Sequence, residues 1–161
     1  LWDEALQVEA AGWKGRRGSA IQTNPDIAPF YRAYALRTCE QGILRILFLR
    51  LGSEAAATMI ALETAGRFWI LKIGYDERFA KCSPGLLLME AGLRHAARQG
   101  LKTFEFMGGE APWTHRWTHR GRPNVAVAVY PYTPRGMTLL LRDAARFVWS
   151  TGRRLLHGGA S

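Results

Sequence analysis

The segment from Tyr75 to Gly85 joins the end of an expected strand to the start of an expected helix, and its residue types suit an anion. Ser83-Pro84-Gly85 is typical of a helix N-terminus, with Ser83 at the N-cap and proline in the first helical position. Free amides and the positive end of the helix dipole bind anions there, and Gly85 lets a ligand approach the backbone closely. With Lys81 as a mobile cation, the segment predicts a pyrophosphate cradle. The plainer alternative is an ordinary helix start.

Two glutamates near the end of the next expected strand are candidates for a general base. Glu105 lies between Phe104 and Phe106, so alternation along a strand puts its side chain on the face opposite theirs. If the phenylalanines face the core, Glu105 faces either a cleft or the solvent. Glu110 follows two glycines at the strand end, where reactive groups are common. Both glutamates therefore stay open as the base.

A four-residue pattern of tryptophan, threonine, histidine and arginine occurs twice in succession over residues 113–120. At helical spacing, residues four apart share a face, so Trp113 and Trp117 lie together, as do the paired histidines and arginines. A zinc site would need a third ligand and a nearby glutamate at suitable spacing, so no metal is expected. The tryptophans with Arg116 suit a sugar or a phosphate-bearing acceptor. The alternative is tryptophan in the core, with solvated arginine and histidine.

These residues are expected to be positioned by a mixed sheet with helices packed on both of its faces. Three strands form an antiparallel meander in this prediction, at Ile43–Leu51, Ala56–Glu63 and Arg67–Tyr75. The amphipathic helix Pro84–Arg98 then leads to strands at Leu101–Met107 and Asn124–Tyr132. Further helices are expected at residues 2–11, from Pro25 or Asp26 to Gly42, and at Met137–Leu156. The order predicts an α/β (α+β) fold in which a strand–helix–strand crossover follows the meander.

The composition fits one domain over residues 1–161 in a reducing compartment. The chain is 48% hydrophobic, which is enough for a single core. No apolar run of about 18 residues occurs, and acidic Asp3 and Glu4 stand where a signal peptide would be basic. Cys39 and Cys82 have neither metal nor disulfide spacing. A cytoplasmic location is therefore expected.

The net charge of +9, with a pI near 10.3, would attract nucleic acid, an anionic membrane surface or a phosphate-rich cofactor. The arginines are spread along the chain and no recognition motif accompanies them, so nucleic acid is not an expected partner. Residues 136–157 are expected to form a basic amphipathic helix. Such a helix can lie on an anionic membrane, which would make the protein peripheral to the inner membrane. The alternative, which we prefer from the sequence, is docking on the sheet or on a partner domain.

Several motifs along the chain resemble those of one superfamily. They are Trp13-Lys14-Gly15, Gly18-Ser19-Ala20, Phe30-Tyr31, Ser83-Pro84-Gly85-Leu86-Leu87, Phe104-Glu105-Phe106, Gly109-Glu110 and Trp117. On these residues the chain resembles the GNAT superfamily of acyl-CoA-dependent N-acyltransferases. It is most similar to the CelD/BcsL-like acetyltransferases of polysaccharide biosynthesis, a branch related to the Fem-type aminoacyl transferases. The superfamily's usual loop is Gln/Arg-x-x-Gly-x-Gly/Ala; residues 80–85 depart from that pattern and agree with the branch.

The resemblance implies an acyl-CoA co-substrate, acetyl-CoA or another acyl-CoA, lying against the strand that ends at Tyr75. The residues implied to hold it are Ile73, Gly74, Tyr75, Lys81, Cys82, Ser83, Pro84, Gly85 and Leu86. An amide of Ile73 or Gly74 would hold the thioester oxyanion. An amine of a sugar or other small acceptor would attack directly, with Glu105 or Glu110 as the base. The residues implied to surround the acceptor are Tyr31, Trp113, Arg116 and Trp117.

Two comparisons with members of this branch add further hypotheses. Branch members often carry Tyr-Lys where this sequence has Trp113-Thr114, which leaves the alternative of a catalytically silent module that binds a partner protein or carbohydrate. Branch members also tend to hold two such domains in tandem. The chain is then expected to be the C-terminal half of a longer protein, with a second GNAT-like domain or a second copy as its partner.

Overall fold

The computed structural model describes residues 1–12, 18, 20–108, 113–123, 125 and 127–157, with side chains as far as Trp149. The chain divides into two compact units, Leu1–His119 and Arg120–Ser161, and each is described by itself. The expectation of one domain over the whole chain stays a prediction.

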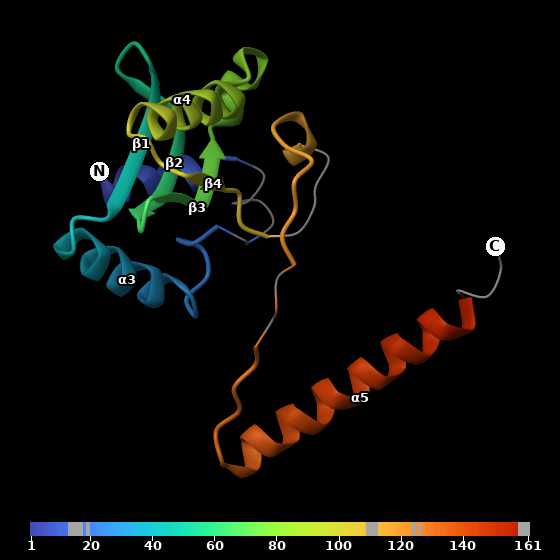
Figure 1. Ribbon diagram of the computed structural model, residues 1–161. Coiled ribbons are helices and arrows are strands. Elements are labelled where there is room, and N and C mark those ends of the chain that lie inside the picture. Colours follow the sequence, from blue (N-terminus) through green and yellow to red (C-terminus); the bar gives the residue numbers. More distant parts are fainter. Residues whose placement is uncertain (13–17, 19, 109–112, 124, 126, 158–161) are drawn as a thin grey trace. The chain divides into compact units, whose positions relative to one another are not determined.

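The first unit is a four-stranded sheet with helices on both faces, as predicted (Figure 1). Its strands are β1 (Leu44–Leu51), β2 (Glu54–Thr64), β3 (Arg67–Tyr75) and β4 (Thr103–Glu105), in the order β1-β2-β3-β4. The first three are antiparallel, and β4 is parallel to β3. The parallel pair needs a crossover, which helix α4 (Pro84–Arg98) supplies. The mixed α/β fold is therefore confirmed.

Two hydrophobic clusters attach the helices to opposite faces of the sheet. Alternate residues of β2 divide between them: Met59 is buried toward α4, and Ile60 toward helix α1 (Trp2–Ala10). Leu88 of α4 completes the first cluster, and Ala5 of α1 the second. Helix α3 (Ala28–Glu40) adds Tyr31 to the α1 side.

A β-bulge in β3 sets which residues face α4 near the end of the strand. Ile60 pairs with Lys72 but Ala61 pairs with Ile70, so Leu71 is an extra residue on β3. Ile70 packs in the α4 cluster before the bulge, and Ile73 packs there after it. Leu71 packs on the opposite face. Without the extra residue, strict alternation would turn Ile73 toward α1.

Strands β3 and β4 pair over three positions, and β3 then continues without β4. The pairs are Arg67 with Thr103, Phe68 with Phe104, and Trp69 with Glu105. The expected strand Leu101–Met107 is thus shorter than predicted, because Phe106 and Met107 lie outside the ladder. The last part of β3, up to Tyr75, is left with β2 as its one paired neighbour among the described strands.

The expected strand Asn124–Tyr132 is wrong. Its described residues are irregular, and Val125, Val127 and Val129 are exposed. The alternating valines suit a strand, but a strand forms only where a neighbour accepts its backbone hydrogen bonds. The described part of residues 120–157 contains no strand to do so.

The second unit contains helix α5 (Pro134–His157), close to the predicted bounds. Thr133 precedes it, and its Oγ1 accepts a hydrogen bond from the Gly136 amide at 3.1 Å, as an N-cap does. The Tyr130 hydroxyl donates to Asp143 Oδ2 at 2.8 Å, which ties the preceding segment to the helix. This hydrogen bond lowers the pKa of Asp143.

Candidate active site

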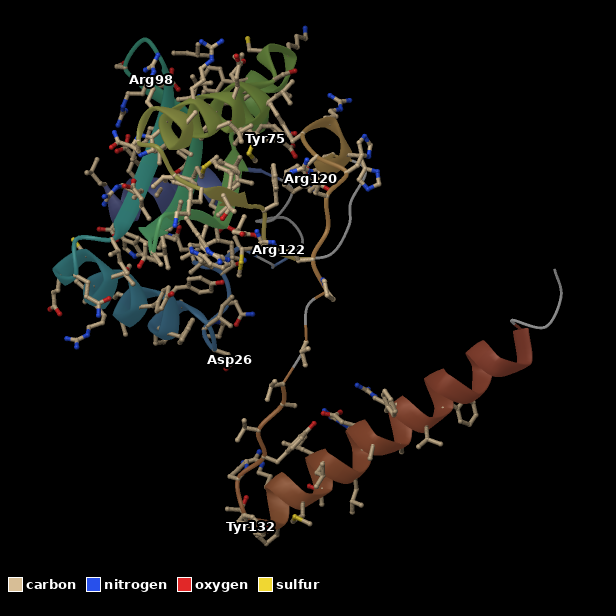
Figure 2. All side chains as sticks on the ribbon, in the orientation of Figure 1. Asp26, Tyr75, Arg98, Arg120, Arg122 and Tyr132 are labelled. Atoms are coloured by element: carbon tan, nitrogen blue, oxygen red, sulfur yellow. The ribbon has the colours of Figure 1, made fainter. Side chains whose placement is uncertain are left out.

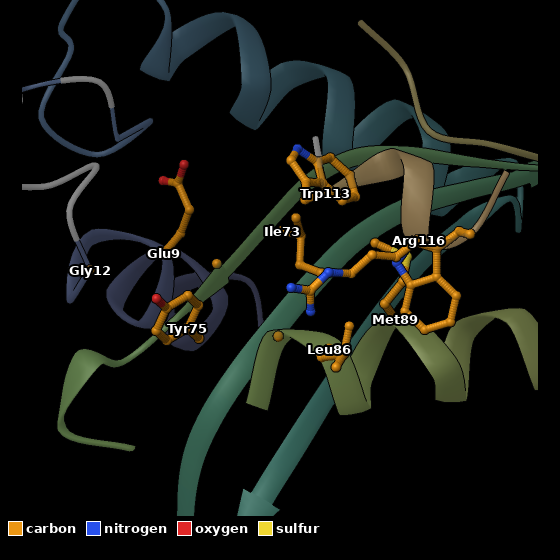
Figure 3. Close-up of a pocket in the computed structure, with 11 residues that line it drawn as sticks. Glu9, Gly12, Ile73, Tyr75, Leu86, Met89, Trp113 and Arg116 are labelled. Atoms are coloured by element: carbon orange, nitrogen blue, oxygen red, sulfur yellow. The ribbon is translucent and has the colours of Figure 1, made fainter. Parts of the chain in front are cut away.

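A cavity of about 580 Å³ lies at the end of β3 and the start of α4 (Figure 3). Four segments line it, and the list combines most of the predicted cofactor residues with most of the predicted acceptor residues. The lining residues are Glu9, Gly12, Ile73, Gly74, Tyr75, Gly85, Leu86, Met89, Trp113, Arg116 and Trp117. Two groups of residues that the sequence assigned separately thus share one cavity.

The backbone of β3 presents two amides toward the side of the strand away from β2. The Asp76 amide donates to Ala56 O at 2.9 Å, and Thr58 pairs with Gly74. Because hydrogen-bonded pairs alternate along an antiparallel ladder, the Gly74 amide also points to β2. The amides of Ile73 and Tyr75 therefore point the other way. The amides of Ile73 and Gly74 are the two expected at the thioester. The Gly74 amide instead points toward β2 within the sheet.

The loop after β3 is a 3₁₀ helix, η1 (Glu77–Cys82), held by an aspartate at its start. Asp76 accepts hydrogen bonds from the Arg78 amide and from Arg78 Nε, both at 2.9 Å. The bond to the Arg78 side chain lowers the pKa of Asp76, although burial opposes that shift. The Arg78 side chain is thus already hydrogen-bonded to Asp76. Lys81 and Cys82 are exposed on this loop, and neither lines the cavity.

The start of α4 differs in detail from the expected helix N-terminus. Ser83 is the N-cap, but it adopts a left-handed conformation (φ 48°) and its side chain makes no cap hydrogen bond. The Leu86 and Leu87 amides both donate to the Ser83 carbonyl, at 3.0 and 3.2 Å. Pro84 has no N–H. In the described part of the chain, the Gly85 amide is therefore the one donor of this turn without an acceptor in the protein.

Helix α1 approaches β3 so closely that only glycine fits between them. A Cβ on Gly74 would stand 2.8 Å from Glu9 Cα, and one on Gly12 would stand 2.8 Å from the Tyr75 carbonyl oxygen. Glu9 is 1% exposed, and its Oε2 accepts the Ile21 amide at 2.9 Å. This contact fastens the segment after α1 to the helix beside the cavity.

Sequence reasoning missed Glu9, Gly12 and Met89 as lining residues. A signal for Glu9 was present, because it falls four residues after buried Ala5 on the apolar side of α1. A carboxylate on that side must have a buried hydrogen-bond partner. The identity of that partner required the fold.

The segment 113–117 forms another wall of the cavity. Residues Thr114–Arg116 are one 3₁₀ turn, η2, rather than part of a longer helix. The rings of Trp113 and Phe106 meet edge to face at 5.9 Å, and Trp117 packs against the α4 cluster. Arg116 extends its guanidinium toward Ile73 and Leu86 (Figure 3). It makes no hydrogen bond or ion pair with any residue that the structure describes.

Besides Lys81 and Cys82, four predicted site residues that the structure describes do not line this cavity: Tyr31, Ser83, Pro84 and Glu105. Glu105 lies on β4, where its Oε1 is 3.7 Å from Arg67 Nη1 at the beginning of β3. Tyr31 lies on the α1 side of the sheet, where Lys72 Nζ is 5.5 Å from its ring centroid. Glu110 lies outside the described residues. The described ranges of the chain contain no group of three metal-ligating side chains.

The comparisons with known proteins agree with this geometry. A family model described as an acetyltransferase (GNAT) domain matches residues 1–115, which covers all four strands and the segments that line the cavity up to Trp113. Neither the curated proteins nor the solved structures gave a match. Because the family model covers well over half of the chain, the protein belongs to the GNAT acetyltransferase family, whose members transfer acyl groups from acyl-CoA.

Proposed function

We propose that the cavity binds acetyl-CoA and that the protein transfers the acetyl group to an amine of a sugar or another small acceptor. The observation that carries the proposal is the shared cavity, in which the end of β3, the start of α4 and the segment 113–117 meet. The elongated acyl-CoA arm suits a cavity lined mainly by apolar side chains and open at a helix start. The CelD/BcsL-like branch, with its role in polysaccharide biosynthesis, is the part of the family that the loop sequence favours.

The start of α4 is the proposed pyrophosphate site. The Gly85 amide donates to a phosphate oxygen, and the helix dipole adds to the attraction. Exposed Lys81 can reach an anion from the preceding loop. Arg116, which has no described acidic partner, supplies a second cation from the opposite wall.

The edge of β3 is the proposed site of the pantetheine arm. The Tyr75 amide points to this edge and donates to an amide carbonyl of the arm or to the thioester oxygen. A donor held in place before the reaction stabilises the charge that develops on that oxygen. The acceptor lies between Trp113 and Trp117, which present apolar faces to a sugar ring.

Glu110 is the proposed general base. An amine with a pKa near 10 must lose a proton before it attacks, so a carboxylate is required within reach directly or through water. Glu105 is held beside Arg67 and does not line the cavity. Glu110 precedes Trp113 by three residues in the sequence, which favours it over Glu105.

Calorimetric titration with acetyl-CoA tests the proposal, followed by a thiol-release assay with amino sugars. Lys81→Ala should weaken binding by roughly tenfold through the loss of one charge-assisted contact. The matched control is Lys102→Ala, in a lysine outside the cavity, which should bind as the unaltered chain does. No binding at millimolar acetyl-CoA would refute the proposal.

The same assay distinguishes the two candidate bases. Glu110→Gln should lower turnover by roughly 10²- to 10⁴-fold with little change in acetyl-CoA affinity, whereas Glu105→Gln should leave turnover nearly unchanged. Acetyl-CoA binding without turnover on any amine would favour the catalytically silent module, for which Thr114 in place of lysine is the supporting observation.

A further inference from the structure

Helix α5 carries two chemically different sides. At 100° per residue, Arg135, Arg142 and Arg146 fall within about 40° of one another around its axis. A stripe of apolar residues lies on the opposite side. The stripe consists of Met137, Leu140, Leu141, Ala144, Phe147 and Val148.

The large side chains of the apolar stripe are exposed. Figure 2 shows the side chains of the described part of the helix as sticks. Leu141, Phe147 and Val148 are 66%, 71% and 69% exposed. The segment before the helix contacts it through Tyr130 and Asp143, a polar pair outside the stripe. A continuous apolar surface of this kind on a basic helix marks an interaction site.

The sheet of the first unit offers no uncovered apolar face for another helix among its described residues. Its α4 cluster is closed by Leu88 and Met89, and the opposite cluster by Ala5 and Ile21 with Tyr31 of α3 packed against it. The sequence favoured docking of α5 on the sheet or on a partner domain, and of these two the sheet has no such face among its described residues. The apolar stripe of α5 therefore needs a partner other than this sheet to cover it.

The charge of the helix selects the kind of partner. The α5 sequence has five arginines and one aspartate, a net charge of +4, within a chain whose net charge is +9. An anionic lipid surface attracts such a helix electrostatically and then accepts its apolar side at the boundary of the acyl chains. No described helix is long and apolar enough to cross a bilayer, so α5 would lie along the surface.

We propose that α5 is a membrane-surface helix, which places its apolar stripe in the interface of an anionic membrane and its arginines among the lipid headgroups. The inference stands independently of acyl transfer, because none of its residues lines the cavity. It would bring the cavity to acceptors presented at a membrane.

Vesicle flotation of the full chain tests the proposal. The probes are phosphatidylcholine vesicles and vesicles that also contain about 30% phosphatidylglycerol. The chain should float with the anionic vesicles, and binding should fall as salt screens the arginines. Leu141→Glu should lower the partition coefficient by at least about tenfold, because it places a charge in the apolar stripe. The double variant Arg142→Gln, Arg146→Gln should lower it by roughly 30-fold.

The matched control is Leu36→Glu on α3, since Leu36 is 61% exposed and Leu141 is 66% exposed. It should bind vesicles as the unaltered chain does. Absence of binding to anionic vesicles overturns the proposal, and so does equal loss in both leucine variants. A dimer that Leu141→Glu dissociates, in a chain that ignores vesicles, would assign the stripe to a second copy instead. Acetyl-CoA titration of each variant should be unchanged, which keeps this outcome separate from the proposed acyl transfer.

Discussion

Gly85→Ala adds one methyl group at the second position of α4. We expect this methyl group to stabilise the fold and to weaken binding of the ligand. The new Cβ would have Tyr75 Cδ1 as its nearest neighbour, at 3.4 Å, which is an ordinary contact. Replacing glycine by alanine in a helix stabilises a protein by about 0.5–1 kcal/mol. For a domain of this size that is a rise in Tm of roughly 1–4 °C.

The same methyl group should weaken acyl-CoA binding. It stands beside the one donor of this turn that has no described acceptor, so it hinders the close approach of a phosphate to the Gly85 amide. A hydrogen bond to a charged group contributes about 1.5–3 kcal/mol, which corresponds to roughly a 10- to 100-fold loss of affinity.

Thermal unfolding and calorimetric titration with acetyl-CoA measure the two effects on one preparation. The expected result is a variant that is at least as stable as the unaltered chain and binds the ligand more weakly. Unchanged affinity would remove the Gly85 amide from the pyrophosphate site. A lower Tm would show that the fold requires glycine at position 85, although an added Cβ would meet Tyr75 Cδ1 at an ordinary distance of 3.4 Å.

Two further predictions concern the fold itself. Gly74→Ala should destabilise the protein by about 1–3 kcal/mol in urea unfolding, because its Cβ would stand 2.8 Å from Glu9 Cα, a backbone atom that cannot move aside; a change below about 0.5 kcal/mol would contradict the close approach of α1 to β3. Glu63 Oε2 lies 3.0 Å from both His95 Nε2 and Arg45 Nε, and these contacts, that with His95 first, lower the pKa of Glu63 below 4.5. A carboxyl with a lowered pKa stabilises the folded state above its unfolded-state pKa and loses that contribution as pH falls through the folded-state pKa. The stability difference between the unaltered chain and Glu63→Gln should therefore be largest at neutral pH and shrink below pH 4.5, and a difference that is constant with pH would contradict the assignment.

The elements that the sequence predicted well are those with strong local signals. The meander followed from apolar runs separated by glycine turns, and α4 from its periodicity and from proline at its first position. The bounds predicted for β3 and α4 agree with the structure. The residues at the end of β3 and the start of α4 could therefore be expected to lie together, and Ile73, Tyr75 and Gly85 line one cavity.

The features that the sequence did not predict depend on contacts between distant residues. Nothing in the residue types around Leu71 marks a bulge, since a leucine there suits a regular strand equally well. Gly74 and Glu9 are distant in the sequence and become neighbours only because α1 packs on β3. Val125, Val127 and Val129 show the reverse case, in which a clear local signal is not matched by a paired strand among the described residues.

The extra residue at Leu71 makes one strand serve two separate purposes. Ahead of it, β3 is a structural strand, paired on both sides and committed to the core by Phe68 and Ile70. Beyond it, the strand borders the cavity with Ile73 and Tyr75. Deletion of Leu71 would turn the side chains of residues 72–75 to the opposite faces of the sheet. The side chains of residues 67–70 would keep their faces. Among the residues after the bulge, substrate preference is then open to change at Ile73 and Tyr75, which line the cavity, whereas Gly74 is fixed by the close approach of α1.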